Sequence, residues 1–458
     1  MNMSRAIKPD FSNGAGMDDG ASQREQGERR VMHKVSKRLL WFLFVLFVFS
    51  FLDRINIGFA GLTMIKDLGL SSTQFGLATT LFYVAYIIFG IPSNIALARI
   101  GAAKWIGSIM IAWGLASTAT MFASSAASLY VLRIIVGVTE AGFLPGMLLY
   151  MTYWFPPAYR ARANALFMIA MPVTAAVGSA ISGYILGLDG TFGIKGWQWL
   201  FLLEGLPSAL LGLAVYVYLN DTPQQAKWLA ADEKATLADM IARARPDERP
   251  VTDEGQKKSL LRELFSPIVI KFGLAYLCLV NTLAMVAVWA PLIVRSFNAG
   301  ASNAQVGLLA AIPQVCTIIG MVVWGRHSDL RQERRWHIVL PMLLAAAGWI
   351  LSAYSTSPVV QLTGVCLAST GSYTAMSIFW TMPDYALSFK ARAIGIAAIN
   401  ALGNIGSALN PVVVGWLKDA TQSFSAGLLY ASVLLVVGAA VILVLPAPQR
   451  TARDGSLR

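Results

Sequence analysis

The chain has 458 residues, of which 56% are hydrophobic and 13% charged, and its mean hydropathy is +0.60. A water-soluble protein carries roughly 25% charged residues, so this composition excludes a soluble fold that could bury so much apolar surface. The net charge of +12 does not indicate nucleic-acid binding, because the basic residues stand in short loops between apolar segments. We therefore expect a membrane protein that contacts the lipid bilayer and a small solute.

Residues 1–37 are polar, of mixed charge and without the apolar run of a signal peptide, which predicts a disordered cytoplasmic tail. Apolar segments of about the 20 residues that a spanning helix needs then recur along the chain. They cover about 39–61, 75–97, 103–123, 127–151, 163–187 and 198–218, then 268–294, 303–325, 337–355, 359–382, 393–416 and 424–446. The pattern predicts an all-α membrane protein with twelve transmembrane helices.

The twelve segments divide into two sets of six. A charged stretch, residues 220–266, separates residues 38–219 from residues 267–447, and a second tail follows at 448–458. Residues 153–163 and 380–393 resemble each other, since an aromatic residue and a proline lead into a Lys/Arg-Ala-Arg-Ala run in both. This half-chain repeat predicts two pseudo-symmetric six-helix bundles with a binding site between them, which is the plan of many secondary transporters.

Lys and Arg are concentrated in the loops after even-numbered helices, such as Arg160 and Arg162, and are few in the loops after odd-numbered ones. Because cytoplasmic loops carry the excess of basic residues, both termini and the 220–266 linker are expected in the cytoplasm. The expected location is a bacterial inner membrane.

Four ionisable residues fall deep inside predicted helices: Asp53, Arg54, Arg133 and Glu140. Each would cost a few kcal/mol if it faced lipid unpaired, so they must pair or line a wet cavity. Arg133 and Glu140 share a helix face because they are seven residues apart, and depth allows an ion pair between Asp53 and Arg133. If either carboxylate gains a proton, the group becomes net positive and favours an anion. The alternative is a helix-packing network without substrate contact.

Aromatic and small polar residues inside the predicted helices indicate what kind of substrate is transported. Tyr83 and Tyr86 share one helix face, as do Asn400 and Asn404, and Met171 lies on another helix. Tyr and Met side chains suit an aromatic ring better than a polyol, although core packing explains any one of these residues equally well.

Other chemistry is not indicated. The three cysteines are far apart in sequence, and no metal-ligand set or nucleophile motif is present, so we expect neither an enzyme nor a metal or cofactor. A proton is the expected coupling ion. Glu204 stays ambiguous, because it can simply bond a neighbouring helix end.

Three segments carry a family resemblance. Residues 51–58 (Phe-Leu-Asp-Arg-Ile-Asn-Ile-Gly), 133–146 and 196–207 resemble motifs of the anion:cation symporter family of the major facilitator superfamily. Residues 42–50 and 165–172 look most like bacterial 4-hydroxyphenylacetate permeases. The resemblance implies proton symport of a small aromatic carboxylate by alternating access, with a monomer as the working unit. Tartrate, phthalate or a sugar acid is the alternative cargo.

The resemblance also implies roles for single residues. Asp53 and Glu140 match proton-handling carboxylates of the family, and Arg54 and Arg133 match positions implicated in anion binding or coupling. Tyr86 and Asn400 match substrate-contact positions of sugar-acid relatives. Met171 stands where such relatives can carry a polar residue, which fits a less polar cargo. Tyr83 and Asn404 join the expected binding set through the faces they share with Tyr86 and Asn400.

Overall fold

The computed structural model describes residues 15–243, 266–387 and 389–445, and every regular element in them is a helix. The first bundle contains α1 (Ala15–Asp67), α2 (Ser72–Ile100), α3 (Ala102–Ala119), η1 (Thr120–Phe122), α4 (Ala126–Glu140), α5 (Phe143–Trp154), α6 (Pro157–Ile185), η2 (Leu186–Leu188), η3 (Thr191–Gly193) and α7 (Gly196–Tyr218). The turn η4 (Pro223–Gln225) and helix α8 (Ala231–Arg243) follow it.

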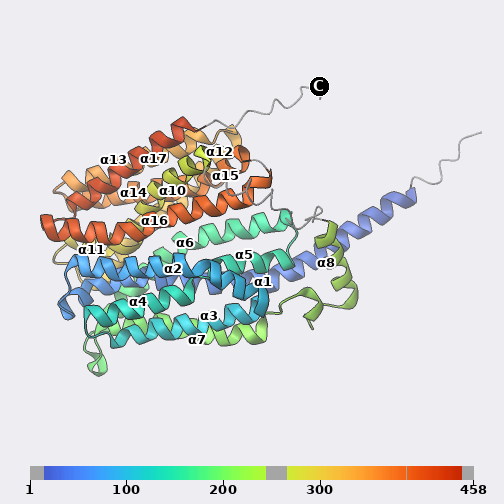
Figure 1. Ribbon diagram of the computed structural model, residues 1–458, viewed down its shortest axis with the longest axis horizontal. Helices are drawn as coiled ribbons and strands as arrows, with labels where there is room; N and C mark the ends of the chain where they lie inside the picture. The colour runs from blue at the N-terminus through green and yellow to red at the C-terminus, as the bar shows by residue number, and fades with distance from the viewer. Residues whose placement is uncertain (1–14, 244–265, 388, 446–458) are drawn as a thin grey trace, which may run out of the picture.

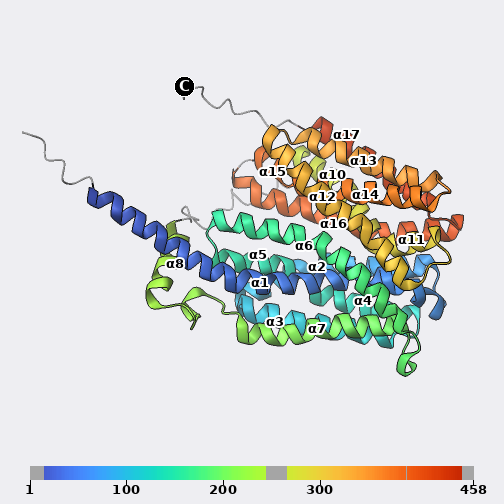
Figure 2. The same cartoon turned by 180° about the vertical axis from the view of Figure 1, so that it is seen from behind.

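The second bundle contains α10 (Pro267–Ala284), the π-helical turn η5 (Met285–Trp289), α11 (Ala290–Phe297), α12 (Asn303–Arg331), α13 (Arg335–Tyr354), α14 (Pro358–Phe379), α15 (Thr381–Ala386), α16 (Phe389–Thr421) and α17 (Ser425–Val444). The two bundles lie side by side, with helices α1 to α7 in one and α10 to α17 in the other (Figure 1, Figure 2). The predicted all-α fold of two bundles is confirmed.

Eleven helical segments of the described chain are long and apolar enough to cross a membrane. Two of them join two α-helices: α4 and α5 form one span that turns at Ala141 and Gly142, and α10, η5 and α11 form another. The twelfth helix is α14, whose 22 residues suffice to cross although its Gly, Ser and Thr residues make it less apolar. It packs against α12 and α13 inside the second bundle.

The start of a helix is set in the same way in both halves. Ser71 and Gln74 form a capping box at α2, and Ser302 and Gln305 form one at α12, in each case with the Ser side chain accepting from the N3 amide. These are the second spans of the two bundles, so the half-chain repeat extends to the hydrogen bonds that begin a helix.

The structure differs from the sequence prediction at the N-terminus, because helix α1 already begins at Ala15. Its polar part leaves the bundle and runs beside α8 (Figure 1). Ion pairs join the two helices, with Lys34 Nζ 2.6 Å from Glu233 Oε2 and Arg24 2.6 Å from Asp239 Oδ2. The hydrogen bond from Lys34 lowers the pKa of Glu233. The charged residues that predicted a disordered tail therefore form ion pairs with residues about 200 positions later in the sequence.

The bundles touch closely at one end, where α1 ends and α2 begins. All hydrogen bonds between bundles in the described residues lie there. Asp419 of α16 accepts from the backbone amides of Ser72 and Thr73 at 3.0 and 2.7 Å and from the Thr73 hydroxyl at 2.6 Å, and Thr80 donates to the Ala408 carbonyl at 2.7 Å. A Cβ at Gly58 would lie 2.6 Å from the Val288 carbonyl oxygen, so α1 meets η5 backbone to backbone.

Candidate functional site

An ion pair between two transmembrane helices lies inside the first bundle. Arg54 of α1 donates from Nε to Glu140 Oε1 at 2.5 Å, and Ser50 Oγ lies 3.4 Å from the same oxygen. The Glu140 side chain is 1% exposed and that of Arg54 21% exposed. The Arg54 guanidinium also lies over the Tyr86 ring, 4.7 Å from its centroid. Because Arg54 is partly exposed, another anion can reach its guanidinium when Glu140 no longer pairs with it.

Asp53 sits in a separate, fully buried cage of donors. Trp113 Nε1 donates at 2.7 Å, Ser117 Oγ at 2.8 Å, Ser208 Oγ at 3.1 Å and Asn56 Nδ2 at 3.2 Å. These donors come from α1, α3 and α7. Four hydrogen bonds to one carboxyl supply neutral stabilisation without a cation.

The predicted ion pair between Asp53 and Arg133 is wrong. No ion pair joins the two residues in the described chain. Successive residues of a helix point about 100° apart, and the side that Asp53 takes is the one facing Trp113 and Ser208. The partner of Glu140 is instead Arg54.

Arg133 of α4 is a buried cation without a carboxylate partner among the described residues. It is 1% exposed, its Nε has no acceptor, and its guanidinium lies over the Phe82 ring, 4.8 Å from the centroid. Tyr83 and the carboxylates of Glu140 and Asp53 are within electrostatic reach, although neither carboxylate forms an ion pair with Arg133. The site therefore holds one cation more than it balances by direct pairing.

The other predicted binding residues are distributed over both bundles. Tyr83 and Tyr86 stand with Phe82 on α2, next to the two arginines. Met171 of α6 is partly buried against Phe51, Ile55 and Ala175. On α16, Asn400 is exposed and Asn404 partly exposed, and no hydrogen bond of the described residues ties them to the charged group.

Glu204 of α7 is also buried, at 2% exposure. It lies near Asp53, and Ser182 Oγ of α6 donates to its Oε1 at 2.7 Å. Glu204 thus bonds a neighbouring helix, which is one of the roles that the sequence left open for it.

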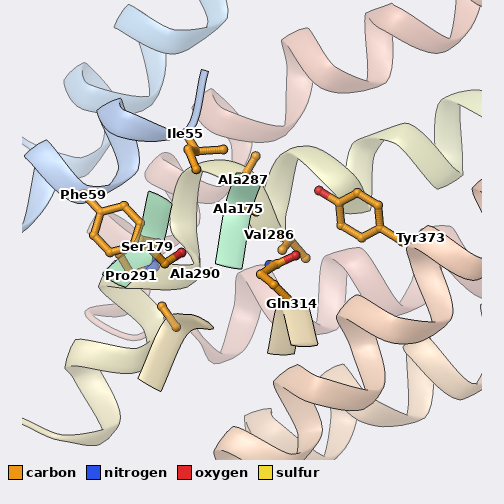
Figure 3. Close-up of a pocket in the computed structure, with 11 residues that line it drawn as sticks. Ile55, Phe59, Ala175, Ser179, Val286, Ala287, Ala290, Pro291, Gln314 and Tyr373 are labelled. Atoms are coloured by element: carbon orange, nitrogen blue, oxygen red, sulfur yellow. The ribbon is translucent and has the colours of Figure 1, made fainter. Parts of the chain in front are cut away.

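A small cavity between the bundles has three polar lining residues that the sequence analysis missed. Its volume is about 20 Å³, and α1, α6, η5, α11, α12 and α14 line it (Figure 3). Ser179, Gln314 and Tyr373 contribute the polar groups, and each is at most 5% exposed. None of the three donates or accepts a side-chain hydrogen bond among the described residues, and Gln314 Oε1 is buried without a partner. Ile55, the neighbour of Arg54, is part of the wall.

Known proteins with similar sequences are transporters. Residues 42–411 and 300–456 match the Major Facilitator Superfamily. A protein of Agrobacterium vitis whose name assigns it to tartrate transport is 42% identical over 91% of this chain and 95% of that protein. The metabolite transport protein NicT of Pseudomonas putida is 39% identical over 93% of this chain and 97% of its own length. The inner membrane transport protein RhmT of Escherichia coli is 33% identical over 91% and 95%.

Solved structures share the fold at low sequence identity. A bacterial homolog of the human lysosomal transporter Spinster, in an inward-facing and unoccupied conformation, has a TM-score of 0.74 at 18% identity and covers 90% of this chain and 97% of its own. The xylose transporter XylE of E. coli, in an inward-open conformation, has a TM-score of 0.71 at 14% identity, with the same coverage. The chain belongs to the Major Facilitator Superfamily and is a multi-pass membrane transporter, not an enzyme.

Proposed function

We propose that this transporter moves a small organic anion together with a proton by alternating access. The observation that carries the proposal is the buried guanidinium of Arg133, which forms no ion pair with a carboxylate among the described residues, beside the Arg54–Glu140 pair. A buried cation of this kind costs a few kcal/mol, and a substrate carboxylate would supply the missing countercharge.

The Arg54–Glu140 pair gives the proton a role. When Glu140 takes a proton it stops neutralising Arg54, and a second cation becomes free for the anion. Asp53 provides a further carboxyl whose charge changes on protonation, held by neutral donors. Proton and anion then favour each other's binding, because each compensates the charge that the other leaves unbalanced. With cytoplasmic termini, the closed end of the bundles is the external one and the cargo leaves toward the cytoplasm.

The first candidate cargo is an aromatic monocarboxylate such as 4-hydroxyphenylacetate. Phe82, Tyr83 and Tyr86 place three rings beside the arginines, and Met171 is the adaptable apolar side chain on α6. A carboxylate at the cations with a ring among these side chains fits that arrangement.

The second candidate cargo is tartrate, which is favoured by the names of the two Agrobacterium vitis relatives at 42% and 40% identity. Tartrate carries two carboxylates, so it would use Arg54 and Arg133 together once Glu140 is protonated.

Uptake into liposomes tests the function and separates the two cargoes. Purified protein is supplied with labelled 4-hydroxyphenylacetate or tartrate under an imposed pH gradient, acidic outside. A coupled proton can drive about tenfold accumulation for a gradient of about one pH unit. 4-Hydroxyphenylacetamide, which lacks the charge, should not compete. Equal uptake with and without the gradient would remove proton coupling from the proposal, and stronger competition by tartrate would select the second cargo.

Substitutions test the assigned charges. Asp53→Asn and Glu140→Gln fix a neutral side chain, so exchange of external for internal substrate should persist while gradient-driven accumulation is lost. Arg54→Ala and Arg133→Ala remove the positive charge that binds the anion, so both activities should fall together. If both carboxyl variants still concentrate substrate, the proton binds elsewhere and these two residues are structural.

A further inference from the structure

A second buried carboxyl lies near Asp53 in the core of the first bundle. Glu204 Oε1 accepts a hydrogen bond from Ser182 Oγ at 2.7 Å, but Oε2 is buried without any partner. No ion pair reaches Glu204 in the described chain. Glu204 has no role in the symport of proton and anion proposed above.

Asn56 lies between the two carboxyls. Its Nδ2 donates to Asp53 Oδ1 at 3.2 Å, and its side chain also faces Glu204. Its Oδ1 is the second buried acceptor here that lacks a donor. Ser208, one turn after Glu204 on α7, makes a further link by donating to Asp53 Oδ2 at 3.1 Å.

A proton on Glu204 would supply the donor that its unpartnered Oε2 lacks. A protonated carboxyl gains a donor, so Glu204 could donate from Oε2 to a neighbouring acceptor of the Asn56 side chain while Oε1 keeps the bond from Ser182. An ionised Glu204 would instead bury a second negative charge near Asp53, with no ion pair to balance it among the described residues. The described groups that act on Glu204 offer no compensating cation: Asp53 and Asn56 face it from α1, and α6 presents the hydroxyl of Ser182.

We propose that Glu204 is a further proton-binding residue of the transport cycle and that Asn56 joins it to Asp53, so that the two carboxyls gain and lose protons as a pair. Coupling of this kind is expected wherever two carboxyls share a buried site. The inference rests on the proton symport proposed above.

The depths of the two carboxyls in the bundle indicate the order in which a proton reaches them. Glu204 lies eight residues after the start of α7, about 12 Å along the helix, whereas Asp53 lies 14 residues before the end of α1, about 21 Å. Both helix ends are at the closed end of the bundles, so Glu204 is the shallower carboxyl on that side. A proton arriving from that side meets Glu204 before Asp53.

Glu204→Gln is the decisive variant, because glutamine is the neutral isostere of a protonated glutamate. Its amide can still donate to the Asn56 side chain and accept from Ser182, so a purely structural role would be preserved. We expect substrate exchange to persist, while accumulation falls by about tenfold for a gradient of about one pH unit, as for the loss of one coupled proton. Accumulation at the wild-type level across the pH range would overturn the inference.

Ser182→Ala is the matched control, since it removes a hydrogen bond from the same carboxyl but no titratable group; its accumulation should stay coupled to the gradient. Infrared difference spectra provide a readout that needs no transported substrate: the carboxylic acid carbonyl band of the wild type should lose intensity in Glu204→Gln. An unchanged band would contradict a protonated Glu204. If the wild type itself accumulates no anion, the proposed function fails, and the infrared result still decides the protonation of Glu204.

Discussion

Neighbouring residues of α1 reach different chemical environments within one helical turn. Arg54 turns toward α4 and pairs with Glu140, whereas Asp53 turns into the bundle and meets only neutral donors. The two proton-binding candidates of the site are thus held differently, one by a cation and one by hydroxyl and indole groups. Protonation of Glu140 frees the Arg54 cation that it pairs with, while protonation of Asp53 removes a negative charge that no cation pairs with directly.

Gln314 and Tyr373 form the polar wall of the cavity between the bundles, together with Ser179. A cavity of about 20 Å³ holds a water-sized group and no ring, so a single hydroxyl of the cargo fits it. Gln314→Leu and Tyr373→Phe should each weaken the binding of a hydroxylated substrate by about 1 kcal/mol, which is about fivefold in affinity. The substrate without that hydroxyl should bind both variants as it binds the wild type.

Two pairs of probes measure this effect: 4-hydroxyphenylacetate against phenylacetate, and tartrate against succinate. Competition for labelled uptake gives the ratio of affinities in each pair, for the wild type and for each variant. An equal loss for both members of a pair would mean that the cavity does not contact the cargo hydroxyl.

The site shows where sequence reasoning succeeds and where it ends. Asp53, Arg54, Arg133 and Glu140 could be found because charge inside an apolar span is rare and expensive. Their pairing could not, because the direction of each side chain depends on helices far away in sequence. Gln314 gave no signal at all, since one polar residue in an apolar segment looks like any other.

At the scale of single elements, the closed end of the bundles depends on how one helix begins. Asp419 at the end of α16 accepts from the Ser72 and Thr73 amides and from the Thr73 hydroxyl, at 3.0, 2.7 and 2.6 Å. The first amides of a helix lack partners within it and attract negative charge. A residue of the second bundle therefore caps a helix of the first, and the cap must break whenever the bundles separate at this end.

Asp419→Ala should favour opening at this end, because an N-cap contributes about 1 kcal/mol, or about fivefold in the ratio of closed to open molecules. Spin labels at the exposed positions Lys66 of α1 and Thr421 of α16 would report the change as a larger population of long distances. Asp419→Asn, which keeps an oxygen acceptor but loses the charge, should shift the populations less. Identical distance distributions in all three proteins would show that the cap does not hold the end closed.

Other elements differ from simple apolar runs for local reasons. The fourth span turns at Gly142, where a Cβ would collide with Ser93, and the seventh contains the π-helical turn η5 at the cavity wall. A π-turn frequently occurs at a functional site, because it re-aims side chains along an otherwise regular helix. The apolar runs predicted that these spans exist, but neither irregularity changes hydropathy enough to be visible in the sequence.

At the scale of the whole molecule, the twelve spans and the two bundles follow from composition and repetition, because lipid leaves few alternatives to apolar helices. The N-terminal part of α1 was harder to predict. Its charges are balanced by α8, a helix about 200 residues later, and only the folded chain brings them together. The placement of charged residues also predicts on which side of the membrane α1 and α8 pair.

The excess of Lys and Arg after even-numbered spans predicts that α8 faces the cytoplasm. A cysteine at the exposed Ala235 of α8 should therefore resist an impermeant thiol reagent in intact cells and react after lysis, in a chain whose Cys278, Cys316 and Cys366 are replaced. A cysteine at the exposed Thr191 of η3, between the fifth and sixth spans, is the matched control and should react in both conditions. The opposite pattern would place α8 outside, turn the closed end of the bundles toward the cytoplasm, and reverse the side from which Glu204 is reached. The same two cysteines thus decide both the orientation of the chain and the direction of the proton path.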